Sequence, residues 1–315
     1  MVYVYLSMSV AVKEEIDTMH CCASCGIAGV DEIKLKDCSA CHLVKYCSDE
    51  CKNDHRKQHK KECKKRAAEL KDEILFKQPE SNHYGDCPLC CLPLPLDIAK
   101  SVCYSCCSKR ICDGCNYANQ NRELEGRLQK KCPFCRKPLP DTDEDIIERW
   151  MKRIEANDPD AICDMGTRRY HEGDYDAAFD YLSRAAALGD VVGHYHLSCL
   201  YGEGKGVVKD KCRALHHAEQ AAIAGHHYAR HNLGCWEEES GKVDRAAKHW
   251  IIAAKLGFDR SLECIKDLYK DGLVSKEDFE AALRGHHAAI VATKSRQREE
   301  AYDSSTAMKS LGRAG

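Results

Sequence analysis

The sequence predicts two small zinc-stabilised fingers followed by an all-α solenoid of helical repeats. Of its 23 cysteines, eight lie in residues 21–63, ten in residues 87–135 and five beyond. Most cysteines of the first two groups occur as C-x2-C pairs, the spacing at which two thiolates reach one zinc ion. From residue 159 onward, glycines and alanines recur at intervals of 36 and 32 residues. Recurrence at that interval is typical of helical repeats.

Length and charge limit the classes of protein to consider. A chain of 315 residues has room for two or three domains. With 48 Lys and Arg against 50 Asp and Glu, the formal net charge of −2 excludes a globally basic nucleic-acid binder and an acidic, solvating chain. Hydrophobic residues make up 43 %, enough for globular cores.

The first 20 residues are expected to form an N-terminal extension. Their apolar stretch, MVYVYLSMSVAV, lacks the basic residues that open a secretory signal. No apolar run reaches the roughly 18 residues of a membrane span. We therefore expect an intracellular protein, cytoplasmic or nuclear, in which thiols stay reduced and free to bind metal.

The first cysteine block, residues 21–63, offers eight metal ligands, enough for two tetrahedral zinc sites. They are Cys22, Cys25, Cys38, Cys41, Cys47, Cys51, His59 and Cys63. Two alternatives stay open: Cys21 could replace Cys22, and His55 could replace His59. The C-x2-C spacing favours Cys22, and His42 is expected to be a solvated loop residue.

This block resembles a MYND zinc finger along its whole length, including Tyr46 and the HKKEC ending at residues 59–63. The resemblance implies interleaved sites, one of Cys22, Cys25, Cys47 and Cys51, the other of Cys38, Cys41, His59 and Cys63. It also implies a protein-interaction module that takes proline-rich peptides. Arg56 stands where many members carry a Trp, and proline-rich peptides dock against aromatic walls.

A basic helix and linker are expected over residues 64–86. Residues 52–77 hold ten Lys and Arg against five Asp and Glu. Such a run can meet phosphate, but it lacks the interleaved aromatic residues of a nucleic-acid site. We interpret it as a solvated helix face.

The second cysteine block, residues 87–140, again offers eight ligands and two surplus thiols. The ligands expected are Cys87, Cys90, Cys106, Cys107, Cys112, Cys115, Cys132 and Cys135. Its segments CPLC, ICDGC and CPFCRKPLP resemble an all-cysteine RING finger. The resemblance implies a cross-brace with Cys87, Cys90, Cys112 and Cys115 in one site and Cys107, Cys132, Cys135 and one central cysteine in the other. Lys109 occupies the usual histidine position, so Cys106 is favoured as that ligand, with Cys103 as the alternative, and Cys91 is expected to be a buried thiol.

RING fingers are known chiefly as ubiquitin ligases that hold an E2 enzyme. Family contact positions map here onto Leu89, Pro133 and Arg136. The alternative is that Leu89 and Pro133 only shape the metal knuckles while Arg136 is a solvated charge. The polar insert at residues 116–131, with a short helix expected at 122–131, modestly favours this alternative.

A linker helix is expected over residues 141–158, because acidic residues follow Thr142 and an apolar stripe begins at Ile146. Repeats are then expected over residues 159–293, with a disordered polar tail at 294–315. Alignment on Gly189, Gly225 and Gly257 places alanines eleven, four and three residues before each glycine.

Alanines at these offsets share one helical face, and a glycine just past the helix end serves as a stop signal. The pattern resembles Sel1-like repeats, best in GEGKGVVKD at 202–210. The resemblance implies about three and a half helix pairs whose concave face binds another protein. Eleven of the 16 histidines fall here and are expected at the surface or lining the groove, while the five cysteines are expected to pack in the core.

The function predicted is therefore a zinc-binding adaptor that holds four zinc ions and binds other proteins through its first finger and its repeats. The alternative is a RING-type E3 ubiquitin ligase whose repeats select the substrate. No catalytic triad, phosphate loop or dinucleotide fingerprint is present in the sequence, so the prediction leans away from an enzyme. Nucleic acid and membrane are not expected as partners.

Overall fold

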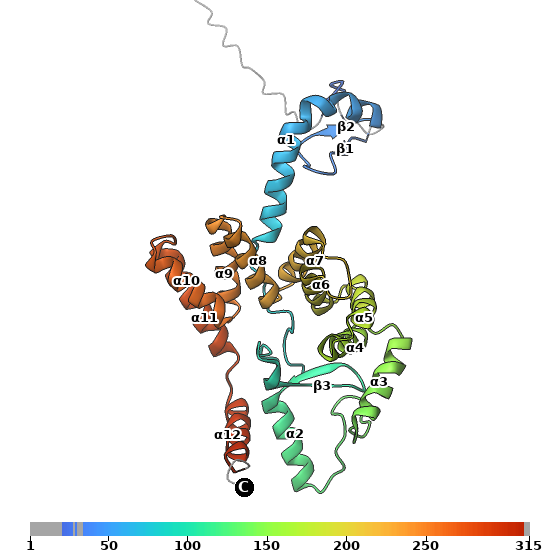
Figure 1. The fold of residues 1–315 in the computed structure, drawn as a ribbon, viewed down its shortest axis with the longest axis vertical. Coiled ribbons are helices and arrows are strands. Elements are labelled where there is room, and N and C mark those ends of the chain that lie inside the picture. The colour runs from blue at the N-terminus through green and yellow to red at the C-terminus, as the bar shows by residue number, and fades with distance from the viewer. Residues whose placement is uncertain (1–20, 28, 30–33, 312–315) are drawn as a thin grey trace, which may run out of the picture. The chain divides into compact units, whose positions relative to one another are not determined.

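The computed structural model describes residues 21–27, 29 and 34–311, with side chains of the last helix described to residue 305. The expected N-terminal extension, residues 1–20, lies outside the described residues. The chain divides into two compact units, one ending at Ile74 and the other beginning at Leu75 (Figure 1). Among the described residues, none of the helices combines the length and the apolar character that crossing a bilayer requires.

The first unit is a small finger built around cysteines. Strands β1 (Lys36–Asp37) and β2 (Lys45–Tyr46) pair antiparallel and lead into helix α1 (Asp49–Leu75). The helix includes the start of the basic helix and linker expected over residues 64–86, and it also carries the ligands Cys51, His59 and Cys63 of the first finger. It runs on unbroken because residues 49–75 contain no glycine or proline.

The second unit opens with the other finger. A 3-10 turn, η2 (Ile98–Lys100), precedes strands β3 (Ser101–Tyr104) and β4 (Lys109–Cys112), which form an antiparallel hairpin, and helix α2 (Asp113–Glu125) follows. The short helix expected at 122–131 is wrong, because α2 starts earlier and ends at Gly126, whose N–H bonds to the carbonyl of Arg122. Leu94, Tyr104 and Ile111 form the apolar core together with five cysteines.

An all-helical region follows, in which most helices pack mainly on their neighbours in sequence, while α11 packs mainly on α9. Its helices are α3 (Asp143–Glu155), α4 (Pro159–Glu172), α5 (Tyr175–Ala187), α6 (Val191–Glu203), α7 (Lys211–Ile223), α8 (His227–Glu239), α9 (Val243–Lys255), α10 (Asp259–Lys270) and α11 (Lys276–Ala292). Helix α3 occupies the place of the expected linker helix, with Thr142 and Asp145 forming a capping box.

The repeat positions behave as their residue types predict. Gly189, Gly225 and Gly257 have φ values of 88°, 86° and 96°, the left-handed conformation that ends a helix. The alanines that precede them are buried, so adjacent helices approach closely. These features confirm the expected all-α repeat solenoid. The expectation for the five cysteines holds for buried Cys163 but is wrong for Cys212, which is exposed in the first turn of α7.

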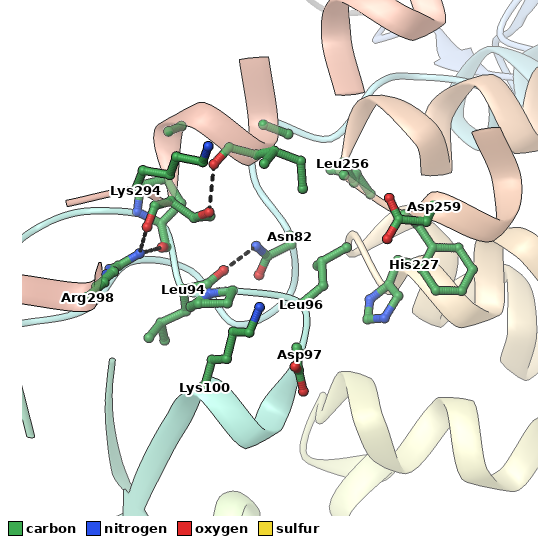
Figure 2. Close-up of a pocket in the computed structure, with 18 of the residues that line it drawn as sticks. Asn82, Leu94, Leu96, Asp97, Lys100, His227, Leu256, Asp259, Lys294 and Arg298 are labelled. Atoms are coloured by element: carbon green, nitrogen blue, oxygen red, sulfur yellow. Dashed lines mark hydrogen bonds between the residues drawn. The ribbon is translucent and has the colours of Figure 1, made fainter. Parts of the chain in front are cut away.

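The described part of the polar tail, residues 294–311, is not disordered as expected. Residues Arg296–Leu311 form helix α12, which packs against α2. The Arg298 guanidinium donates to the carbonyl oxygens of Pro93 and Thr293, each at 2.8 Å (Figure 2). A Cβ atom at Gly114 in α2 would lie 2.7 Å from the backbone nitrogen of Arg298. The absence of a side chain at this glycine therefore allows the two helices to contact each other. The tail is ordered by this docking and not by its composition.

The histidines at 226 and 227 are not at the surface as expected. His226 is 3 % exposed and His227 1 % exposed. The ring of His83, from the segment before the second finger, lies 4.3 Å from that of His226. Burial lowers the pKa of His83 to about 3 and that of His227 to about 4, which keeps both rings neutral at pH 7.

Candidate metal centres

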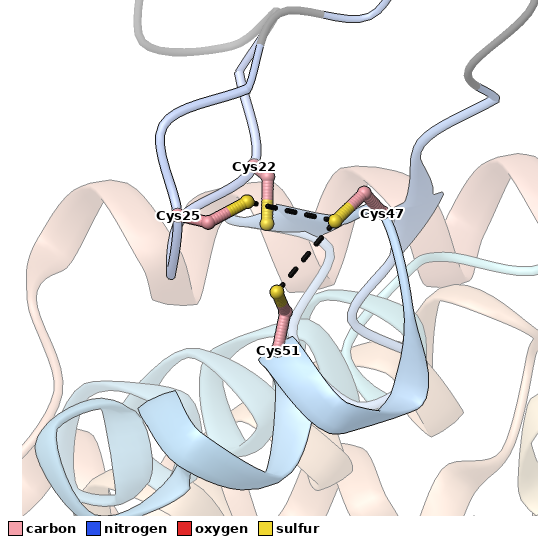
Figure 3. A group of neighbouring side chains, drawn as sticks. All are labelled: Cys22, Cys25, Cys47 and Cys51. Carbon is pink, nitrogen blue, oxygen red and sulfur yellow. Dashed lines mark hydrogen bonds between the residues drawn. The ribbon is translucent and has the colours of Figure 1, made fainter.

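The first group joins the N-terminal knuckle to the start of α1 (Figure 3). It contains Cys22, Cys25, Cys47 and Cys51. The Sγ atoms of Cys25 and Cys47 are 3.6 Å apart, as are those of Cys47 and Cys51. Cys51 lies on the first turn of α1 and Cys47 just before it, so the helix start aims both sulfurs at the knuckle.

The second group contains Cys38, Cys41, His59 and Cys63. Sγ of Cys38 lies 3.7 Å from that of Cys63, and Sγ of Cys41 lies 3.2 Å from Nε2 of His59. His59 and Cys63 are four residues apart on α1 and therefore share one face. His55 lies outside the group, because its Nδ1 is 3.1 Å from the Tyr46 hydroxyl, and Cys21 also lies outside.

Two further groups lie in the second finger. One contains Cys87, Cys90, Cys112 and Cys115, and the other contains Cys106, Cys107, Cys132 and Cys135. The Sγ atoms lie 3.8 Å apart in Cys90 and Cys112, 3.6 Å apart in Cys107 and Cys132, and 3.3 Å apart in Cys106 and Cys135. Along the chain the groups alternate, which is the interleaving of a cross-brace.

Cys103, the alternative to Cys106, lies outside the group that contains Cys106, Cys107, Cys132 and Cys135. It lies in β3 opposite Arg110. Burial raises the pKa of its thiol to about 12, and nearby Asp164 adds to the rise. The structure gives the fourth position of the group to Cys106, whose Sγ atom lies 3.3 Å from that of Cys135.

The four C-x2-C knuckles that begin at Cys22, Cys38, Cys87 and Cys132 share one backbone pattern. This pattern fixes the position of the ligand cysteines and of the residue that follows the second cysteine. In each, the N–H four residues after the first cysteine bonds back to that cysteine's carbonyl. The donor residue has a left-handed φ: 74° at Gly26, 55° at His42, 55° at Cys91 and 61° at Arg136. The expectation that Cys91 is a buried thiol is wrong, since this turn leaves the residue exposed.

The separations fit a tetrahedral zinc site. With Zn–S bonds of about 2.3 Å, sulfurs at the corners of a tetrahedron lie about 3.8 Å apart. The ligand atoms of each group, one from each residue, all lie within 4.8 Å of one another. The sulfurs are much too far apart for disulfides, whose bond length is about 2.0 Å. The structure thus contains four candidate sites, and the residues present suit zinc.

The close approach of the thiols within each group also affects their pKa values. Burial opposes the thiolate at Cys22, but backbone N–H donors from Cys25 and Cys47 outweigh it and lower its pKa to about 6. The neighbouring thiols raise the pKa of Cys47 to about 12. One thiolate therefore forms readily and hinders the next, so the full set ionises only when a cation balances it. Metal binding must then release protons.

Arg298 is a residue near these sites that sequence reasoning missed. Its guanidinium lies 3.4 Å from Sγ of Cys90. Burial raises the pKa of Cys112, while Arg298 acts in the opposite direction and favours its thiolate. The contact joins residues 208 positions apart, so no local pattern could have revealed it.

The three positions suggested for E2 contact lie on the knuckles of the second finger. Leu89 is 46 % exposed, Pro133 is half-buried and Arg136 is exposed in its left-handed turn. On α2, Glu123 is buried and accepts hydrogen bonds from the side chain of Asn119 at 3.1 Å and from the backbone of Lys131 at 3.3 Å. The helix thus packs a polar network against the start of the last knuckle.

Fold and sites together define a zinc-finger protein with a helical-repeat region. Comparison with family models makes this specific: residues 22–63 match the MYND finger, and residues 159–190 and 191–226 match the Sel1 repeat. The chain therefore contains a MYND finger and Sel1 repeats. No curated protein matches the sequence.

Two solved structures are similar to part of the chain. One is c5321, a protective antigen of uropathogenic Escherichia coli strains with an SLR fold, at 28 % identity and a TM-score of 0.39. The match covers 47 % of this chain and 33 % of that protein, so the chain spans about a third of its length. The other is a Sel1 repeat protein from Oxalobacter formigenes, at 26 % identity and a TM-score of 0.42, covering 57 % of this chain and 73 % of that one.

Proposed function

We propose that the chain is a zinc-binding adaptor in which two cross-braced fingers and a helical-repeat platform hold different protein partners. The observation that carries the proposal is the series of four groups of Cys and His ligands, each compact enough for one ion, ahead of a repeat solenoid. MYND fingers and Sel1 repeats both serve as protein-interaction modules. A chain that links two such modules can hold two partners near one another.

The metal content tests the structural half of this proposal. The expected value is four zinc ions per chain, measured by elemental analysis of protein purified without added metal. A strong chelator should unfold residues 22–135, because metal binding supplies the folding free energy of fingers this small. The helices from α4 to α11 should keep their circular dichroism signal after chelation. In the elemental analysis, a value of two zinc ions per chain would contradict the proposal for one of the two fingers.

Partner mapping tests the functional half. Proximity labelling in cells should be compared between the wild-type chain, Cys38→Ser and Val208→Asp. Cys38 belongs to the second metal group, while Val208 is an 88 % exposed apolar residue in the loop between α6 and α7. An adaptor predicts that each variant loses a different subset of partners. Identical partner sets in all three proteins would contradict it.

The alternative, a RING-type E3 ligase, is favoured by one observation, the cross-brace interleaving of the second finger. The polar Asn119–Glu123 pair on α2 weighs against it, because E2 binding calls for an apolar groove at the helix. Autoubiquitination with a panel of E2 enzymes separates the two functions. Loss of ubiquitination in both Leu89→Ala and Arg136→Ala would support the ligase, and a silent panel would leave the adaptor.

A further inference from the structure

The first finger carries a groove of about 620 Å³ beside its second metal group. One side is the loop around Cys38, and the other is α1 from Asp49 to Ala67. Four exposed cations, one helical turn apart, line the helix side: Lys52, Arg56, Lys60 and Lys64. The helix thus presents a single row of positive charge to the groove.

This row is not neutralised within the described part of the finger. None of its four cations forms an ion pair among the described residues, whereas cations further along α1 do. Lys65 lies 3.9 Å from Glu69, and Arg66 lies 2.7 Å from Glu73. Like charges four residues apart destabilise a helix, so the row costs folding stability.

The charge of the groove stays positive when its other groups are counted. Asp49 is the one carboxylate among the described lining residues. A zinc ion held by three thiolates and His59 carries a net charge of −1. The four cations therefore leave an excess of two positive charges, and a ligand that complements the groove must be anionic.

We propose that this groove binds an extended acidic segment of a partner protein, with carboxylates at alternate positions. This inference rests on the proposed role of the finger as an interaction module and names its ligand class. Side chains four residues apart on a helix are separated by about 6 Å along its axis. Alternate side chains of an extended peptide are separated by about 6.6 Å, so successive carboxylates come into register with successive cations.

The same lining disfavours two other ligands. A proline-rich peptide packs on aromatic walls, but Arg56 supplies a cation to the groove. Tyr46 is the one Phe, Tyr or Trp among the described lining residues, and it is only 3 % exposed, with its hydroxyl at 3.1 Å from His55. Single-stranded nucleic acid requires exposed aromatic faces on which bases stack. The observations therefore favour the acidic peptide.

The test uses the zinc-loaded full-length chain and a fluorescein-labelled ten-residue peptide of alternating Glu and Ser. Fluorescence anisotropy should detect binding that weakens as salt is raised. Arg56→Glu and Lys60→Glu should each weaken binding roughly tenfold, because one attraction becomes a repulsion. Lys57→Glu is the matched control, since Lys57 is exposed on the same helix but does not line the groove.

Zinc content of each variant, unchanged from wild type, shows that the finger is still folded. Equal loss in Lys57→Glu and Arg56→Glu would overturn the inference, as would tighter binding of a proline-rich peptide or of a ten-nucleotide oligo-dT. A native partner that is lost in Cys38→Ser but kept in Arg56→Glu would also overturn it, yet leave the adaptor function standing. If Cys38→Ser loses no partner, the adaptor function itself fails at this finger.

Discussion

The guanidinium of Arg298 in α12 lies 3.4 Å from the Sγ atom of Cys90, a member of the third cysteine group. The same side chain donates to the carbonyl oxygens of Leu92 at 3.3 Å and Pro93 at 2.8 Å. One residue of the C-terminal helix thus holds the knuckle that presents two of the proposed zinc ligands. N–H bonds to a thiolate stabilise its charge and orient it toward the metal.

Replacing Arg298 should therefore weaken this metal site and free α12. Arg298→Met keeps much of the apolar stem but removes the donors, and we expect the affinity of one zinc site to fall roughly 10- to 100-fold. Competition with a chromogenic chelator measures this loss, and hydrogen exchange over residues 296–311 reports the release of the helix. Arg296→Met is the control, because that side chain is 91 % exposed and its ion pair among the described residues is with Glu300 of its own helix. Equal zinc release from both variants would contradict a role for Arg298.

The fourth cysteine group separates Cys106 from Cys103 and so predicts different metal contents. Cys106→Ser should lower bound zinc by one ion per chain or make that ion readily removable, because serine is not a ligand that zinc retains in such sites. Cys103→Ser should leave the metal content unchanged, since this residue lies in β3 outside the group. Elemental analysis after dialysis against a weak chelator checks both. A loss on Cys103→Ser alone would reverse the assignment.

The resemblance to MYND and RING fingers implied how the ligand pairs combine into groups. The spacing of ligands along the chain predicted the pairs themselves, because a short knuckle leaves its two cysteines little choice of direction. It could not decide between Cys103 and Cys106, since both stand close to Cys107 and only the β3–β4 hairpin turns one of them away. The order of the tail escaped prediction for another reason. A polar composition indicates disorder, but Arg298 gains its partners from residues 205 to 208 positions away. The burial of His226 likewise depends on His83 from a distant segment.

Two glycines of the repeats form a matched pair for mutation. Gly189 and Gly225 both have left-handed φ values, but only Gly225 is approached by another segment, with the carbonyl oxygen of Ser81 at 2.6 Å from an added Cβ. Gly189→Ala should cost about 1 to 2 kcal/mol for the left-handed conformation alone. Gly225→Ala should cost more, because it also displaces the Ser81 segment.

Chemical denaturation followed by tryptophan fluorescence measures both losses, since all three tryptophans lie in α3, α8 and α9. Hydrogen exchange should accelerate around His83 only in Gly225→Ala, because the His83 N–H bonds to the Gly225 carbonyl at 3.3 Å. Equal stability and equal exchange in the two variants would show that the segment does not dock on the repeats.

The last prediction concerns the buried imidazole of His249 in α9. Its side chain is fully buried, neither ring nitrogen has a hydrogen-bond partner among the described residues, and its ring lies 4.7 Å from that of Phe76. Burial, followed by the charges of Arg230 and Arg245, lowers its pKa from 6.5 to about 3. The unfolded chain therefore binds a proton below pH 6.5 that the folded chain refuses until about pH 3. Stability must fall as the pH falls through this range.

His249→Phe removes this contribution to the pH dependence of stability. Between pH 7.5 and 5.0 the wild-type chain should lose about 2 kcal/mol more unfolding free energy than the variant. Urea denaturation at each pH measures the difference, and acid release of zinc cancels because it affects both proteins. His287→Phe, at an exposed position in α11, should run parallel to the wild type. If the profile of His249→Phe runs parallel to that of the wild type, the folded chain protonates this imidazole as readily as the unfolded chain does. That outcome would contradict the prediction from its burial.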